Sequence, residues 1–271
     1  MKTRLTIILA LILSTIPFND TAARKIKYTG TGIVAHRGFW NCEEAGYAKN
    51  SIAALRCAQQ AGVWGSEFDV NMTADSVLLV FHDSTVEGKK IEKHNHDEFK
   101  YFRLKNGEPI PTLEEYLEQA KQCPETMLVY ELKKHSCPEV EEVAVQMSIR
   151  KLEESGLLDP SRVMFISFSK YICERLSVLL PDFDVQYLNG DIKPYKIKKA
   201  GIPGIDYNYN VLLEKKKWIA HARQRGLSTN AWTVNNEDDM RAILKMKVDM
   251  LTTDNPLEAR EVMKQMEIQE L

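Results

Sequence analysis

The feature that most constrains this fold is an alternation of short, β-rich apolar runs with longer amphipathic runs. Nine runs have the length and composition of strands: residues 33–36, 66–73, 77–82, 127–132, 163–168, 185–188, 204–207, 228–233 and 249–252. Between most of them, apolar residues recur three and four positions apart, as in helices, over residues 51–61, 112–122, 139–155, 170–180, 213–225 and 237–245. Strands that alternate with helices predict parallel strands joined by crossover helices.

One connection breaks this alternation. Only Ala74-Asp75-Ser76 separates the run 66–73 from the run 77–82. A parallel connection needs about a dozen residues, so these two runs are expected to form an antiparallel hairpin. Without the returning strand, eight parallel strands remain in about 250 residues, which predicts a (β/α)8 TIM barrel with a hairpin extension after its second strand. A doubly wound open sheet is the alternative, but it usually has fewer strands and a glycine-rich first turn that this chain lacks.

The N-terminal segment has the layout of a secretory signal peptide. Basic side chains within residues 2–4 precede a mostly apolar run over residues 5–16, and residues 21–23 are small. The apolar run is shorter than the roughly 20 residues that a membrane-spanning helix needs. We therefore expect a signal peptide at 1–23, a single catalytic barrel domain at 24–271, and an exported protein that is periplasmic or secreted. An N-terminal anchor is the alternative.

Composition narrows the class of protein further. The formal net charge of −2 at pH 7 argues against a nucleic-acid binder, which would show a basic excess. The five cysteines are odd in number and show no C-x-x-C spacing. They therefore indicate neither a zinc knuckle nor a disulfide framework.

Three carboxylates are expected to gather where the active site of a barrel lies, at the C-terminal ends of its strands. Glu67 and Asp69 are two positions apart, so on a strand their side chains face the same side. With Glu131 from another strand they would provide three hard oxygen ligands for one Mg²⁺ or Ca²⁺ ion. Zinc, which His36 and His82 could help to bind, suits a carboxylate-rich site less well.

The hairpin predicts where His82 lies. A turn centred on Ala74 and Asp75 would place His82 directly opposite Glu67, with Cβ atoms about 5 Å apart. The same alternation would put Val80 on the face that carries Glu67. His82 is thus expected beside the carboxylates.

The charged residues around this cluster indicate phosphoryl chemistry. Arg37 and Lys133, together with a metal ion, can hold a phosphate and offset the charge that develops in the transition state. One histidine, His36 or His82, can take a proton from the nucleophile while the other protonates the departing alkoxide.

These residues belong to a series of motifs that resembles the glycerophosphodiester phosphodiesterases. In the family's order, the motifs are His36-Arg37-Gly38, Asn50-Ser51-Ile52-Ala53-Ala54, Gly62, Glu67-Phe68-Asp69-Val70, Thr73, His82-Asp83, Glu131-Leu132-Lys133, Ile166-Ser167-Phe168, Trp232-Thr233-Val234-Asn235 and Thr253-Asp254-Asn255-Pro256. The resemblance covers nearly all of residues 24–271. It implies metal-dependent hydrolysis of small-molecule glycerophosphodiesters to glycerol phosphate and an alcohol.

The resemblance also implies a role for each candidate residue. His36 and His82 would be the acid and base, and the three carboxylates would be the metal ligands. Arg37 and Lys133 would bind phosphate, and Trp232 would pack against the substrate. Ordinary barrel core is the alternative for Trp232, since aromatic residues dominate cores.

Two departures from the family pattern bear on the substrate. Lys49 stands where the family usually has a glutamate, and residues 39–48 form a longer loop than usual. Residues 84–111 could form a lid. Two other functions remain open: an exported barrel that binds a phosphodiester without cleaving it, and a related phospholipase-type phosphodiesterase. Capture needs no acid/base pair, so the presence of both histidines and all three carboxylates favours an enzyme.

Overall fold

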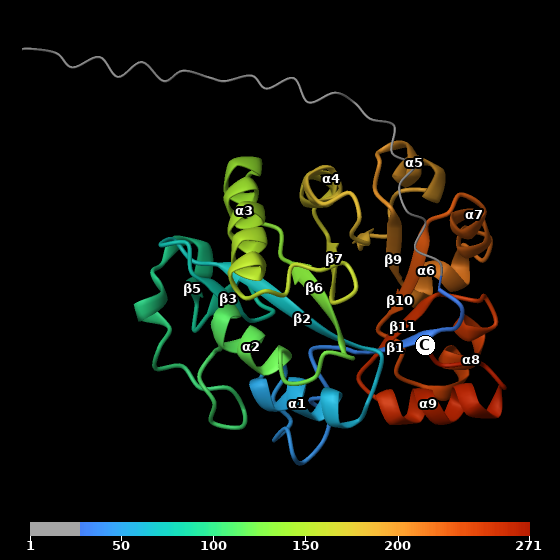
Figure 1. The fold of residues 1–271 in the computed structure, drawn as a ribbon, viewed down its shortest axis with the longest axis horizontal. Coiled ribbons are helices and arrows are strands. Elements are labelled where there is room, and N and C mark those ends of the chain that lie inside the picture. The colour runs from blue at the N-terminus through green and yellow to red at the C-terminus, as the bar shows by residue number, and fades with distance from the viewer. Residues whose placement is uncertain (1–27) are drawn as a thin grey trace, which may run out of the picture.

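Eight parallel strands form a closed barrel in the computed structural model, which describes residues 28–271 (Figure 1). Around the barrel the strands are β1 (Gly32–Ala35), β2 (Gly65–Met72), β6 (Met127–Leu132), β7 (Val163–Ser167), β8 (Val185–Tyr187), β9 (Gly204–Asn208), β10 (Ser228–Trp232) and β11 (Met250–Thr253). Parallel pairing of β1 with both β2 and β11 closes the circle. The predicted (β/α)8 barrel is therefore confirmed, while the predicted signal peptide lies outside the described residues.

Helices cover the outside of the barrel (Figure 1). They are α1 (Ile52–Gln60), α2 (Leu113–Ala120), α3 (Pro138–Glu154), α4 (Lys170–Leu179), α5 (Pro194–Lys199), α6 (Tyr209–Glu214), α7 (Trp218–Gln224), α8 (Glu237–Leu244) and α9 (Pro256–Gln265). The prediction of one helix over 213–225 is wrong, because Lys215 leaves the helical conformation at φ −98° and ψ 50° and divides the segment into α6 and α7. The helical pattern also missed α5 and α9, although each begins with a proline, as many helices do.

Alternation along the strands separates two environments. The outward side chains of the strands join the helices in one large apolar core, in which Phe68 on β2 packs against Tyr116 on α2 with ring centroids 4.6 Å apart. The inward side chains of Val34, Val129 and Met164 form a smaller apolar cluster inside the barrel. The polar side chains of the site are inward residues nearer the C-terminal ends of the strands.

The predicted antiparallel hairpin is confirmed, but its register differs from the prediction by one residue. β3 (Leu78–Val80) pairs with β2 so that Val80 lies opposite Val70. Thr73 N donates to Val77 O, and Ser76 adopts a left-handed conformation with φ 63°. The loop therefore holds three residues instead of two, as in hairpins that end in a left-handed residue.

This shift corrects two predictions. Val80 packs with Val70 in the core between barrel and helices, so it does not share the face of Glu67. His82 lies beyond the last residue of β3 and is not the ladder partner of Glu67. The reason is that one extra loop residue reverses which side chains share a face of a two-stranded ladder.

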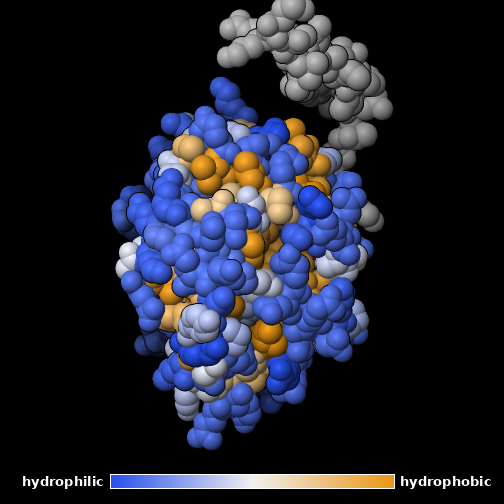
Figure 2. Space-filling model, turned by 90° about the vertical axis from the view of Figure 1, so that its left-hand side faces the viewer, coloured by the Kyte–Doolittle hydropathy of each residue, from blue (hydrophilic) through white to orange (hydrophobic). Residues whose placement is uncertain are grey.

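Residues 84–111 form a small subassembly beside the hairpin. It contains β4 (Thr85–Val86), β5 (Lys89–Lys90) and two short 3₁₀ helices, η1 (Ile91–Lys93) and η2 (His96–Glu98). Val86, Ile91 and Phe99 bury their side chains with Leu79 of β3 in a separate apolar cluster. The surface on this side of the molecule is mostly hydrophilic, with hydrophobic residues in separate patches (Figure 2).

Two further observations concern the chain as a whole. No helix within residues 28–271 is long and apolar enough to cross a bilayer. The five cysteines all lie within this range, and their thiols are free.

Candidate active site

A cavity of about 120 Å³ opens at the C-terminal end of the barrel. Six of the eight predicted site residues line it: His36, Arg37, Glu67, His82, Glu131 and Trp232. The remaining wall consists of Ile166, Phe168, Leu188, Asp206 and Thr252. The other two predicted residues, Asp69 and Lys133, contact this lining directly. Residues 84–111 contribute no side chain to the cavity wall as far as the described chain shows, so the hypothesis that they form a lid gains no support.

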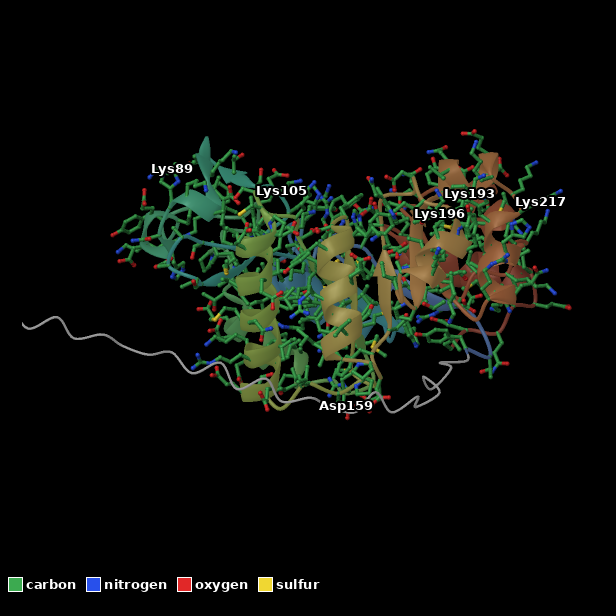
Figure 3. The ribbon with its side chains drawn as sticks, turned by 90° about the horizontal axis from the view of Figure 1, so that it is seen from above. Lys89, Lys105, Asp159, Lys193, Lys196 and Lys217 are labelled. Carbon is green, nitrogen blue, oxygen red and sulfur yellow. The ribbon has the colours of Figure 1, made fainter. Side chains whose placement is uncertain are left out.

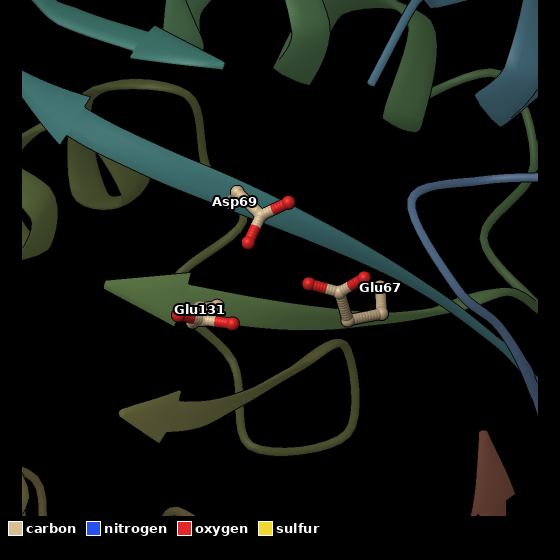
Figure 4. A group of neighbouring side chains, drawn as sticks. All are labelled: Glu67, Asp69 and Glu131. Atoms are coloured by element: carbon tan, nitrogen blue, oxygen red, sulfur yellow. The ribbon is translucent and has the colours of Figure 1, made fainter. Parts of the chain in front are cut away.

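The three carboxylates meet as predicted. Glu67 and Asp69 project from β2, and Asp69 is the register partner of Glu131 on neighbouring β6 (Figure 4). One oxygen of each lies within 4.8 Å of the others, and all three side chains are buried. Three ionised carboxylates this close repel one another unless positive charge is supplied.

Two cations compensate part of this charge. Lys133 Nζ lies 2.7 Å from Glu131 Oε1 and 3.1 Å from Asp69 Oδ1. Arg37 contributes twice, because its Nε lies 3.4 Å from Asp69 Oδ2 and its backbone N donates to Glu67 Oε2 at 2.7 Å. The side chain of Asn50 donates to Asp69 Oδ2 at 2.8 Å and its Oδ1 accepts from Asp69 N. Asn50 thus holds Asp69 in place. It belongs to one of the sequence motifs, but the motif did not predict this role.

The pKa values of the carboxyl groups follow from this arrangement. Burial raises the pKa of Glu67 well above its ordinary value, and the charges of Asp69 and Glu131 raise it further. Burial also raises the pKa of Glu131, to about 7. Burial acts on Asp69 as well, but Lys133, His82 and Arg37 outweigh it and lower that pKa to about 2.

The cluster fits a divalent cation. Glu67 Oε1 is buried and accepts no hydrogen bond from any described residue. Burial and the neighbouring carboxylates make Glu67 and Glu131 hard to ionise, and the positive charge of a divalent ion would oppose this effect. Carboxylate oxygens are the ligands that Mg²⁺ and Ca²⁺ prefer. Glu67, Asp69 and Glu131 could therefore hold such an ion.

His36 is held in one orientation. Its Nδ1 lies 2.8 Å from Asp254 Oδ1, which also accepts from Trp40 Nε1 at 2.8 Å, while Asn235 Nδ2 donates to Asp254 Oδ2 at 2.7 Å. Burial opposes ionisation of Asp254, but these partners, led by His36, lower its pKa to about 2. An ionised Asp254 accepts a hydrogen bond from His36 Nδ1, and Nε2 is the ring nitrogen outside this contact.

Asp254 belongs to one of the sequence motifs, but the motif did not predict a role for it. Its position directly after β11 is the signal that could have found it, since the other site residues also lie at strand ends. The longer loop at residues 39–48 supplies its partner Trp40, and Lys49 Nζ lies 4.4 Å from the centre of the Trp40 ring. The two departures from the family pattern thus contact each other beside His36.

His82 reaches the cavity by a different route from the one predicted. Phe81 N donates to Asp69 O at 2.9 Å, which keeps the chain beside β2 after β3 has ended. His82 Nδ1 then lies 2.7 Å from Asp83 Oδ1, with 40 % of the His82 side chain exposed. Burial of the rest of the ring lowers the pKa of His82, an effect that Asp69 partly opposes.

The opposite wall of the cavity is largely apolar. Trp232, at the end of β10, packs edge to face on Phe168 with ring centroids 5.5 Å apart, and its Nε1 donates to Asp206 O at 3.1 Å. Asp206 itself is a carboxylate that the sequence did not single out. It is only 1 % exposed, and burial raises its pKa well above the ordinary value.

Two histidines, two cations and three buried carboxylates at the C-terminal end of a (β/α)8 barrel are the groups that metal-assisted hydrolysis of a phosphate ester requires. The model of the glycerophosphoryl diester phosphodiesterase family matches residues 36–258, and the chain belongs to this family. The resemblance inferred from the motifs is thereby confirmed, as is the prediction of a phosphodiesterase.

Individual relatives support the membership of this family. A glycerophosphodiester phosphodiesterase of Bacillus altitudinis is 29 % identical over 257 residues, which cover 87 % of this chain and 99 % of the relative. A glycerophosphodiester phosphodiesterase from Parabacteroides distasonis, solved by crystallography, shares 38 % sequence identity with this chain. The two structures superpose with a TM-score of 0.85, over 89 % of this chain and 100 % of that one. An Oleispira antarctica phosphodiesterase, solved with sn-glycerol-3-phosphate, shares the fold at 23 % identity and a TM-score of 0.74, over 87 % of this chain and 97 % of that one.

The carboxylate cluster predicts a pH-dependent stability in the absence of divalent ions. Because the pKa of Glu131 is raised from 4.5 to about 7, folding favours its protonated form. The stability that this group contributes is complete below pH 4.5 and is lost as the pH rises through about 7. The melting temperature of chelator-treated protein should therefore fall more steeply over this range than that of Glu131→Gln, as measured by differential scanning fluorimetry. The exposed Glu214→Gln serves as control, and equal slopes for Glu131→Gln and wild type would contradict the raised pKa.

Proposed function

We propose that this protein hydrolyses glycerophosphodiesters to glycerol phosphate and an alcohol, with a divalent cation as cofactor and two histidines as acid and base. The observation that carries the proposal is that His36, His82, Glu67 and Glu131 line one cavity, with Asp69 directly behind. A protein that only captured a phosphodiester would need the cations of this cavity but not two histidines with free ring nitrogens.

The cations position the scissile phosphate. Arg37 and Lys133 each contact a different oxygen of Asp69 and can turn donors toward phosphate oxygens. A divalent cation bound by Glu67, Asp69 and Glu131 would add Lewis-acid stabilisation of charge on those oxygens. We favour Mg²⁺ or Ca²⁺ over Zn²⁺, because all three proposed ligands are carboxylates.

The histidines transfer the protons. His36 is oriented by Asp254 and His82 by Asp83, each through Nδ1, so each can present Nε2 to the substrate. In this hydrolysis one Nε2 takes a proton from the attacking nucleophile, and the other gives a proton to the oxygen of the leaving alcohol, so that one water molecule is consumed overall. His82 is the more exposed of the two, which suits the side from which the alcohol departs.

Positive charge on the side of the molecule that holds the C-terminal ends of the strands favours an anionic substrate. Lys89, Lys105, Lys193, Lys196 and Lys217 lie on one side of the molecule, and Asp159 lies on the opposite side (Figure 3). Lys193 lies between β8 and α5, on the side of the C-terminal strand ends, and Asp159 lies between α3 and β7. Positive charge near a site raises the rate at which anions arrive. The sn-glycerol-3-phosphate bound to the Oleispira antarctica phosphodiesterase is the type of product that we propose here.

Activity should depend on a divalent cation. Exhaustive treatment with EDTA is expected to abolish hydrolysis of glycerophosphocholine, followed by phosphorus NMR, and Mg²⁺ or Ca²⁺ should restore it. The same ions should raise the melting temperature of the wild type, since a ligand at 100 times its Kd stabilises a protein by about 2.7 kcal/mol. Glu67→Gln should weaken both effects, whereas the exposed Glu214→Gln should leave them unchanged. Full activity after chelation would rule out the metal.

Removal of either histidine should abolish turnover without unfolding the barrel. Acid–base catalysis by one side chain contributes roughly 10²–10⁴-fold, so His36→Ala and His82→Ala should each lose at least that much in kcat. His221→Ala, on the outer helix α7, is the matched control and should keep wild-type activity. Circular dichroism checks the fold of all three. Near-normal turnover of either site variant removes that histidine from the mechanism.

We also propose that the protein is exported, because residues 1–23 have the layout of a signal peptide. Cleavage after residue 23 would leave a mature chain that starts at Arg24. N-terminal sequencing of protein recovered from the cell envelope or medium tests this, and an intact Met1 there would contradict it.

A further inference from the structure

One carboxyl group on the cavity wall has a buried oxygen that accepts no hydrogen bond from the described residues. Asp206 on β9 lines the cavity and is 1 % exposed. Its Oδ1 is fully buried, and none of the described residues donates a hydrogen bond to this oxygen. A buried polar atom without a partner loses the free energy of its hydration, and native structures rarely tolerate this without a reason.

The neighbours of Asp206 do not supply the missing hydrogen bond. Asn230 is its register partner on β10, but Asn230 Oδ1 accepts from Thr252 Oγ1, and Asn230 Nδ2 is itself without a partner among the described residues. Trp232 Nε1 donates to the backbone oxygen of Asp206, not to its carboxylate. The carboxyl group is therefore available to a ligand that enters the cavity.

The cavity has two chemically different sides. β1, β2 and β6 are consecutive in the barrel and carry His36, the carboxylates and the cations. β8, β9 and β10 are consecutive on the other side, and apart from Asp206 they present Leu188 and Trp232. A phosphate belongs with the cations, because no described residue on the side formed by β8, β9 and β10 presents a positive charge to the cavity.

A ligand that spans these sides must join a phosphate to a short carbon chain with a hydroxyl group. The apolar side chains of Leu188, Phe168 and Trp232 suit the carbons, and a carboxyl group can accept a hydrogen bond from a hydroxyl in either protonation state. Thr252 Oγ1 has already donated its hydrogen to Asn230, so its oxygen is a second acceptor on the cavity wall. A cavity of about 120 Å³ accommodates a small polyol.

We propose that Asp206 binds a hydroxyl group of the glycerol moiety and thereby selects glycerol esters over esters that lack the hydroxyls. The inference deepens the proposed function and rests on it. Asp206 is in this view a specificity-determining residue, whereas Arg37 and Lys133 serve the phosphate that all phosphodiesters share.

The test compares two substrates that differ only in the hydroxyls. Glycerophosphocholine and propylphosphocholine share the phosphate and the choline, but only the first has free hydroxyl groups. The wild type should prefer glycerophosphocholine. Asp206→Leu should lower kcat/KM for glycerophosphocholine by about 10-fold to 100-fold, the loss expected for one hydrogen bond to a carboxyl group. The kcat/KM for propylphosphocholine should stay nearly unchanged. Asp206→Asn keeps an acceptor oxygen and should restore part of the preference.

Controls separate a substrate contact from a structural role. Asp184→Asn changes another buried carboxyl group, which lies at the start of β8, at the opposite end of the barrel. It should alter stability but not the ratio between the two substrates. If Asp206→Leu does not fold, Asp206→Asn and a binding measurement decide: glycerol 3-phosphate should raise the melting temperature of the wild type more than propyl phosphate does, and Asp206→Asn should reduce that difference.

The outcomes distinguish this inference from the proposed function. An unchanged substrate ratio in folded Asp206→Leu overturns the role of Asp206 even when glycerophosphocholine is a good substrate. An equal effect of glycerol 3-phosphate and propyl phosphate on the wild type also overturns it. If no diester is hydrolysed, the proposed function fails, and the binding comparison still decides whether Asp206 contacts the glycerol hydroxyls.

Discussion

The packing of three carboxyl groups into a buried cluster is the constraint on which the rest of this site depends. Glu67, Asp69 and Glu131 lie within 4.8 Å of one another at the end of two adjacent strands. Removing charges from water is expensive unless opposite charge and hydrogen-bond donors replace the lost hydration. Arg37, which follows β1, and Lys133, which follows β6, supply part of that replacement. The cluster is therefore stable only when the barrel is closed.

The histidines depend on the same closure in unequal ways. His36 is fixed by Asp254, which is 218 positions away in sequence and follows the last strand of the barrel. His82 is fixed by the next residue, Asp83, and is carried into the site by the hairpin that extends β2. One histidine is therefore held by the barrel and the other by a local segment at its rim. This difference also separates the enclosed side of the cavity from the side open to solvent.

The longer loop at residues 39–48 is part of this support. Phe39 N donates to Ala54 O on α1 at 2.9 Å, and Trp40 Nε1 donates to Asp254. Lys49, whose charge could have altered the substrate site, instead lies over the Trp40 ring. The two departures from the family pattern therefore bear on how His36 is held more directly than on the substrate.

The sequence alone determined what depends on short-range geometry. Strand alternation put Glu67 and Asp69 on one face, and a three-residue link required an antiparallel hairpin. The repeated strands and helices favoured a barrel over a doubly wound open sheet, and the residues at the ends of its strands were expected to converge. The hairpin register was beyond reach, because it depends on the left-handed conformation of Ser76, which is uncommon for residues other than glycine and which a serine in the sequence does not indicate. Only the tertiary structure could decide that Asp254 holds His36, that Asn50 holds Asp69, and that Asp206 faces the cavity without a partner. These contacts join strands and loops that are distant in sequence, and they exist only once the barrel has closed.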